Sequence, residues 1–162
     1  MNKNYIPVVM CIGSDRVAGD MLGPKVGELL IGRNIGAYVY GRMGRAVNGD
    51  NIEDYYEFIK ERHRGSVIIA VDACLGKVSE VGRVMYTMSG IGAGFAIRDG
   101  GRRYGDIGIV GIVAESGEDN LKRLTAVRPD SVEKMAGKIT EYITNNMREI
   151  IAKVQYKYCL LL

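Results

Sequence analysis

The sequence contains few of the residues that cross-link small proteins or bind metals. It has no tryptophan, three prolines, three widely spaced cysteines and one histidine, His63, among 162 residues. A zinc-finger site needs four cysteine or histidine ligands at close spacing, so this composition excludes one. The odd number of scattered cysteines instead fits reduced thiols in a cytoplasmic protein.

Charge and hydropathy exclude two further classes of partner. The 22 basic and 19 acidic residues are well mixed and leave a net charge of only +3, which predicts binding neither to nucleic acid nor to an acidic membrane. No apolar run approaches the ~18 residues of a membrane span. Residues 5–12 lead into a polar loop without a cleavage site, so they predict a first strand and not a signal peptide. We expect a cytoplasmic protein and leave homo-oligomerisation open.

Short apolar runs alternate with helical patterns along the chain. Helices are expected from Leu22, over about 51–64, and from Pro129, where Asp130 and Glu133 would form a capping box. Strands are expected at 8–13, 37–41, 67–72, 81–88 and 107–114. A glycine-rich loop is expected over 89–105. With no linker or repeat, this order predicts one α/β domain over residues 1–162, a three-layer α/β/α arrangement with a mostly parallel sheet.

Several familiar catalytic motifs are missing from the sequence. It contains no Rossmann fingerprint, no P-loop and no G-x-S-x-G elbow. His63 lies among charged residues, which predicts a solvated helix face and argues against a Ser–His–Asp triad. Cys11 and Cys74 have apolar neighbours and are expected to be small core residues.

Carboxylates are the remaining candidates for chemistry. Asp15, Asp20 and Asp72 follow expected strands, at the sheet edge where open parallel sheets bind ligands, and Asp106 opens a late strand. An aspartate at the end of an apolar strand costs desolvation energy unless it has a use. Two such groups a few ångströms apart would share a proton and could activate water. Local roles stay open: Asp20 and Asp72 as backbone caps, and Asp15 as a partner of Arg16.

The same stretches resemble a known family. Residues 11–16, 19–24 and 69–76, together with 92–94 and 105–107, are similar to sporulation proteins of the YyaC type. More distantly, residues 20–24 and 69–73 resemble the spore germination protease, an atypical aspartic endopeptidase that degrades small acid-soluble spore proteins. The wider fold group includes the hydrogenase maturation proteases, which implies their phosphorylase/hydrolase-like fold for this chain.

The resemblance carries the two functional aspartates of the germination protease onto Asp20 and Asp72. It also implies a sporulating cell, with the protein in the mother cell, forespore or spore core. The chain departs from its relatives in three respects. Asp20 lies too near the start for a comparable pro-segment, no motif supplies the metal-binding histidine of the hydrogenase maturation proteases, and Asn48 stands near a position where YyaC-type proteins often have histidine.

These observations together predict an aspartic-type endopeptidase without a cofactor, acting on a protein or peptide. Asp20 and Asp72 are the expected catalytic residues. The expected substrate-binding residues are Gly13, Ser14, Asp15, Gly19, Gly92, Gly94 and Asp106. Two alternatives stay open. One is a catalytically inactive protein that binds peptides or partners and regulates sporulation. The other is a metal-dependent hydrolase in which Asp15, Asp20 and Asp72 hold a divalent cation.

Overall fold

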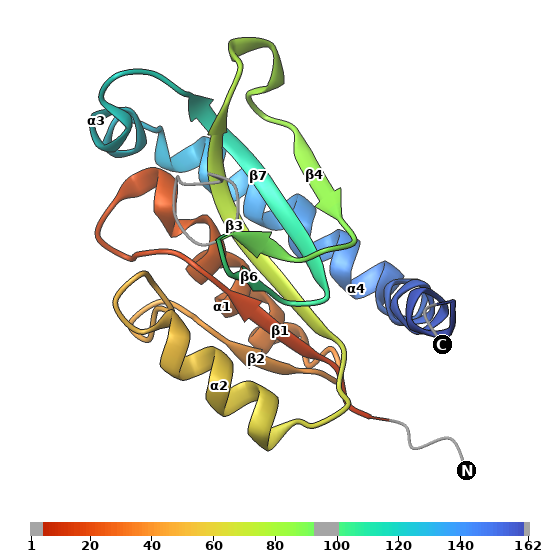
Figure 1. Cartoon of the computed structure of the whole chain (residues 1–162). Coiled ribbons are helices and arrows are strands. Elements are labelled where there is room, and N and C mark those ends of the chain that lie inside the picture. The colour runs from red at the N-terminus through yellow and green to blue at the C-terminus, as the bar shows by residue number, and fades with distance from the viewer. Residues whose placement is uncertain (1–4, 93–100, 161–162) are drawn as a thin grey trace.

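The computed structural model describes residues 5–92 and 101–160. Its main sheet has five strands in the order β2-β1-β3-β7-β4 (Figure 1). The first four of these are parallel, and β4 runs antiparallel to β7. Their bounds are β1 Val8–Cys11, β2 Tyr38–Tyr40, β3 Ile68–Gly76, β7 Ile107–Glu115 and β4 Val84–Thr87. The mostly parallel sheet is therefore confirmed.

Helices cover both faces of this sheet (Figure 1). α1 (Leu22–Arg33) and α4 (Pro129–Cys159) lie on one face. α2 (Ile52–Arg62) lies on the other, with a small sheet of β5 (Ile91–Gly92) and β6 (Arg103–Tyr104). Short helices, η1 (Ala18–Met21), η2 (Val78–Glu80) and α3 (Asn120–Thr125), join the main elements. The three-layer α/β/α arrangement follows.

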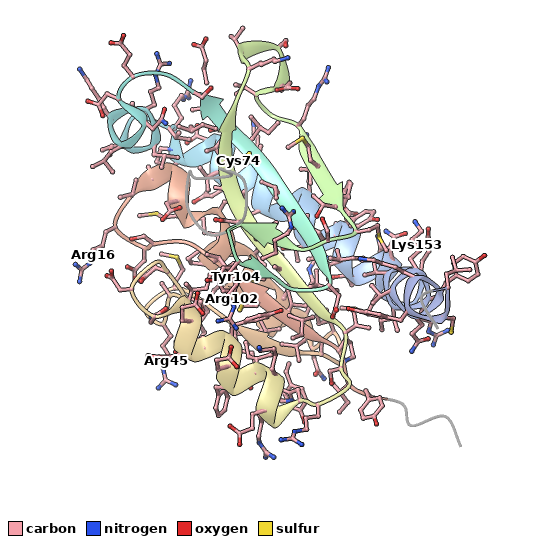
Figure 2. All side chains as sticks on the ribbon, in the orientation of Figure 1. Arg16, Arg45, Cys74, Arg102, Tyr104 and Lys153 are labelled. Carbon is pink, nitrogen blue, oxygen red and sulfur yellow. The ribbon has the colours of Figure 1, made fainter. Side chains whose placement is uncertain are left out.

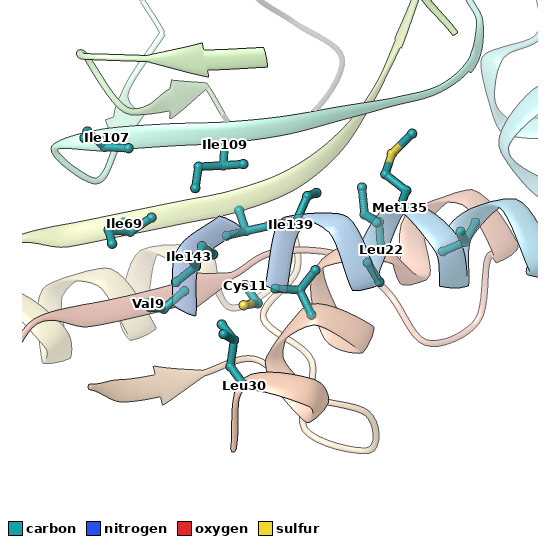
Figure 3. Close-up of a cluster of buried hydrophobic side chains, with 14 of the residues drawn as sticks. Val9, Cys11, Leu22, Leu30, Ile69, Ile107, Ile109, Met135, Ile139 and Ile143 are labelled. Carbon is teal, nitrogen blue, oxygen red and sulfur yellow. The ribbon is translucent and has the colours of Figure 1, made fainter. Parts of the chain in front are cut away.

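The central strands are buried on both faces, as is typical of parallel strands. Val9 and Ile69 face α1 and α4, where they pack with Leu30 and Ile139 (Figure 3). The alternate residues, including Met10, face α2. This continuous burial explains why the sequence shows these strands as unbroken apolar runs.

Glycines bring α1 into direct contact with the sheet backbone. A Cβ atom at Gly23 would lie 1.9 Å from the carbonyl oxygen of Ile12, and one at Gly27 would lie 1.9 Å from that of Gly41. Only glycine fits such close approaches. They hold the first half of α1, and η1 directly before it, against the carboxyl ends of β1 and β2.

The structure corrects several expected boundaries. β3 does not end at Asp72 but continues to Gly76, because its later residues pair with β7. The capping box at Asp130 is wrong: α4 begins after Arg128, and Asp130 lies in the first turn, where it pairs with the Arg128 side chain. Within the expected loop at 89–105, the described residues form β5 and β6.

α4 is the longest described helix, with 31 residues. One stripe of its side chains is buried against the sheet, while charged residues cover the opposite side. None of the helices described here is both long and apolar enough to cross a bilayer.

Candidate functional site

Asp72 lies inside a strand, where the pleat of the sheet determines its direction. Its Cα is in register with that of Val110 on the neighbouring strand β7. The side chain is half-buried, and its Oδ1 accepts a hydrogen bond of 2.8 Å from the Ala73 N–H. This hydrogen bond ties the carboxyl group to the backbone of the next residue.

Asp20 lies on η1, the short helix between the first strand and α1. Its main-chain oxygen accepts a hydrogen bond of 3.1 Å from the Ser14 N–H, which ties η1 to the loop after β1. Gly19, the preceding residue, is buried and packs on Leu124 and Val127, to which a Cβ atom would come within 2.8 and 3.0 Å. Contacts on both sides therefore hold the Asp20 backbone in place.

The two carboxyl groups interact electrostatically. Burial raises the pKa of Asp72 well above its usual value, and the negative charge of Asp20 raises it further, while the hydrogen bond from Ala73 lowers it. Burial also raises the pKa of Asp20, against a backbone hydrogen bond from Ser14 that lowers it. Asp72 is therefore the more readily protonated of the two carboxyl groups.

Cys74, which the sequence predicts to be a small core residue, lies near Asp72. It lies two residues after Asp72 on the same strand and is half-buried (Figure 2). Burial and the charges of Asp72 and Glu80 raise the pKa of its thiol to about 11. Such a thiol stays protonated at neutral pH and is a poor nucleophile.

Four of the expected substrate-binding residues lie near the start of η1. A Cβ atom at Gly13 would lie 2.1 Å from the Asp20 main-chain oxygen, so this glycine is needed for packing. Its N–H already donates to Val47, at 2.8 Å. The Ser14 hydroxyl accepts from the Arg16 N–H, and Gly19 packs on α3. Asp15 accepts a hydrogen bond of 3.3 Å from the Gly44 N–H. Gly13, Ser14 and Gly19 therefore lie beside Asp20, where they contact other residues of the protein, and Asp15 contacts the loop at Gly44.

The other three expected residues do not join this group. Asp106 directly precedes β7, as expected for a residue that opens a strand, and so lies at the amino end of the parallel strands, the edge opposite to that of Asp20. There its carboxylate accepts hydrogen bonds from the Ile68 N–H, at 2.8 Å, and from the Tyr158 hydroxyl, and not from any described residue of the group around Asp20. Gly92 pairs with Arg103 in the small sheet. Gly94 lies outside the described residues.

The donor set does not fit the expected three-carboxylate metal site. Among residues 5–92 and 101–160, no three His, Cys, Asp or Glu side chains form a group that could hold an ion. Asp15 instead contacts the loop at Gly44. The single histidine, His63, follows α2, and its Nε2 lies 2.7 Å from the Tyr40 hydroxyl. It is half-buried against the Tyr38 ring, which corrects the expectation of a solvated helix face.

An open cavity also lies away from the two aspartates. It encloses about 700 Å³ beside the last turns of α4 and is lined by Met88, Lys153, Tyr156 and Leu160, among others. Lys153 is well separated from Cys74 in Figure 2. Its lining includes neither Asp20 nor Asp72, so this cavity is separate from the two carboxyl groups.

Known structures with this fold include maturation proteases. The [NiFe] hydrogenase maturation protease HycI from Thermococcus kodakarensis KOD1 aligns with 91% of this chain and 95% of its own, with a TM-score of 0.55 and 15% identity. HybD, a protease of the same description from Thermococcus kodakarensis, aligns with 86% of this chain and 97% of its own, with a TM-score of 0.56 and 15% identity. At this identity the likeness concerns the fold.

Sequence comparison gives a closer relationship. The "Uncharacterized protein YyaC" of Bacillus subtilis (strain 168) is 36% identical over 135 residues, which are 83% of this chain. The chain spans 66% of that relative's length. Residues 1–142 match the family described as "Protein of unknown function (DUF1256)". The expected similarity to YyaC is confirmed, and the chain belongs to the DUF1256 family.

Proposed function

We propose that this protein is an aspartic-type endopeptidase in which Asp20 and Asp72 activate a water molecule. The observation that supports it best is the interaction of the two carboxyl groups, since the charge of Asp20 adds to the effect of burial in raising the pKa of the half-buried Asp72. Buried groups with perturbed pKa values are concentrated at functional sites. The protease-like fold agrees with this chemistry but does not by itself specify it.

The two aspartates would have different roles. Asp20, ionised, accepts a proton from the water as its oxygen bonds to the peptide carbonyl carbon. Asp72, protonated because burial disfavours its charge, donates its proton to the leaving amine as the C–N bond breaks. The reaction consumes one water and yields a carboxylic acid and an amine. The proton on Asp20 passes to Asp72 and restores the starting state.

Single substitutions at the two aspartates test this proposal. Mass spectrometry of a peptide library incubated with the purified full chain would identify cleaved bonds. We expect Asp20→Asn and Asp72→Asn each to lower kcat/KM by at least about 100-fold, as removal of an acid or base does. Asp54→Asn, at an exposed position on α2, is the matched control and should cleave normally. Cleavage that survives both site substitutions would overturn the proposal.

The pH profile provides a second test. Cleavage requires Asp72 protonated and Asp20 ionised. The rate should therefore fall as pH rises through the pKa of Asp72 and also as pH falls through that of Asp20. A profile that stays flat up to alkaline pH would contradict the assigned roles.

A second function is favoured by the local hydrogen bonds at the site. The Ala73 N–H donates a hydrogen bond to the Asp72 carboxylate, and the Ser14 backbone donates one to Asp20. Such bonds are expected of aspartates that only cap the local backbone. The same fold would then hold a peptide or protein partner without cutting it. Peptide binding that is equal in wild type and Asp72→Asn, with no cleavage by either, would favour this function.

The family resemblance also supports a role in the cytoplasm of a sporulating cell. Immunoblots of the source bacterium should then detect the protein in sporulating cells and far less of it during vegetative growth. Equal amounts in both states would contradict this role.

A further inference from the structure

Asp72 is part of a row of side chains that crosses the main sheet. It is in register with Val110 on β7, and Val110 is in register with Met85 on β4. Directly paired strand residues point to the same face of a sheet. Val110 packs with the smaller core cluster on the α2 side, so Asp72, Val110 and Met85 share that side.

Part of this row is open to solvent. Met85 is 43% exposed and Val110 is half-buried. The small sheet of β5 and β6 covers the neighbouring row of side chains, the row that passes through Gly108. A Cβ atom at Gly108 would lie 2.4 Å from the Ile91 side chain. Gly108 precedes Val110 by two residues on the same strand, so the cover lies one row toward the amino end. We call the open pair, Val110 and Met85, the apolar shelf.

The shelf lies within reach of a peptide cut at Asp72. Neighbouring strands are ~4.8 Å apart, so Val110 lies about 5 Å and Met85 about 10 Å from Asp72 along the row. An extended peptide advances ~3.4 Å per residue. A substrate that crosses the strands with its scissile bond at Asp72 would therefore place a side chain two or three residues away over the shelf.

We propose that the apolar shelf is a specificity subsite that takes an aliphatic or aromatic side chain of the peptide substrate. This inference rests on the proposed function, because the aspartates define where the peptide lies. Neither shelf residue is charged, and the methionine thioether adapts to side chains of different shape. An acidic side chain there would lose water against two uncharged side chains, with no charged partner on the shelf to compensate, so acidic residues should be rejected.

Methyl NMR of the full chain tests the shelf without requiring cleavage. The probes are two capped hexapeptides of alanine that carry either leucine or aspartate at one central position. The protein contains eight methionines, and the Met85 signal is assigned from its loss in Met85→Leu. We expect the leucine peptide to shift the Met85 methyl resonance and the aspartate peptide to leave it unchanged.

Matched variants on one strand complete the test. Met85→Glu should weaken binding of the leucine peptide about tenfold, whereas Met85→Leu should keep the preference. Tyr86→Glu is the control: Tyr86 is 50% exposed but stacks on Tyr142 of α4, with ring centroids 4.5 Å apart, on the opposite face. Equal shifts from both peptides, or equal losses in both glutamate variants, would overturn the shelf. So would a Met85 shift caused by raising the protein concentration alone, which would indicate a second copy on this row.

The outcomes separate this inference from the proposed function. Peptide binding at Met85 without aspartate-dependent cleavage would keep the shelf and reject the peptidase. Aspartate-dependent cleavage with no preference for apolar residues near the cut bond, and with unchanged specificity in Met85→Glu, would keep the peptidase and reject the shelf.

Discussion

Replacing one glycine of α1 with alanine tests the close contact that supports the candidate site. In Gly27→Ala the new Cβ would lie 1.9 Å from the carbonyl oxygen of Gly41. Ordinary C···O contacts are ~3.3 Å or longer, so α1 or the chain at Gly41 must move by about 1.4 Å. The oxygen belongs to the backbone of a residue that itself contacts Cys11, and it cannot rotate away.

The expected size of the effect follows from two opposing contributions. Overpacking in a well-packed core costs ~1–3 kcal/mol, and the upper end applies to an obstacle in the backbone. Alanine gains ~1 kcal/mol over glycine from helix propensity. The free energy of unfolding should therefore fall by about 2 kcal/mol, which lowers Tm by about 4–8 °C in a protein of this size.

The control lies in the same helix. Gly32 has no atom within 4 Å of its would-be Cβ, so Gly32→Ala should keep only the propensity gain, about 1 kcal/mol, and raise Tm by about 2–4 °C. Urea and thermal unfolding followed by circular dichroism measure both variants. If Gly27→Ala were as stable as wild type, the reasoning from close approach would be refuted, together with our account of how α1 is positioned.

Three further measurements test the electrostatics. The pKa of Asp72 is raised in the folded state, so its contribution to stability is complete below the unfolded value and is lost as pH rises through the folded pKa. Each pKa unit between the folded and unfolded states is worth ~1.4 kcal/mol of stability. The free energy of unfolding of Asp72→Asn, measured in urea, should therefore depend less on pH than that of the wild type. Burial and, secondly, the charge of Arg62 lower the pKa of His63; Arg62→Gln should raise it in an NMR titration, and an unchanged value would contradict this. Arg102 pairs with exposed Glu53 and Glu57 on α2; Arg102→Ala should cause a small loss of stability that disappears at high salt, and a loss that persists there would indicate packing instead.

Much of the fold could be predicted from apolar runs, because the central strands are buried on both faces. The runs at β1, β3 and β7 are confirmed, although β3 extends past Asp72. That extension could not be predicted locally, since the pairing of Cys74 with Ile112 depends on a strand far away in the sequence. The short helix α3 was also missed, because its six residues are too few for a clear helical period.

The interaction between Asp20 and Asp72 was predictable for a different reason. Parallel strands end at one edge of the sheet, so the segments after β1 and in β3 had to meet there, and Asp20 does affect Asp72. Asp106 was expected to open β7, and the same rule places the start of a parallel strand at the opposite edge, so it should not have been grouped with the substrate-binding residues. The shelf was not foreseeable, since Met85 joins the row only through the antiparallel register of β4.

The supports of the two carboxyl groups differ in a way that affects their motion. Asp72 belongs to a strand with neighbours on both sides, the most rigid kind of support in a sheet. Asp20 belongs to a four-residue helix that rests on the six-residue α3 through Gly19. Fluctuations of short surface elements occur on faster timescales than the opening of central strands. The separation of the carboxyl groups should therefore fluctuate mainly through displacements of Asp20, with α3 setting their amplitude.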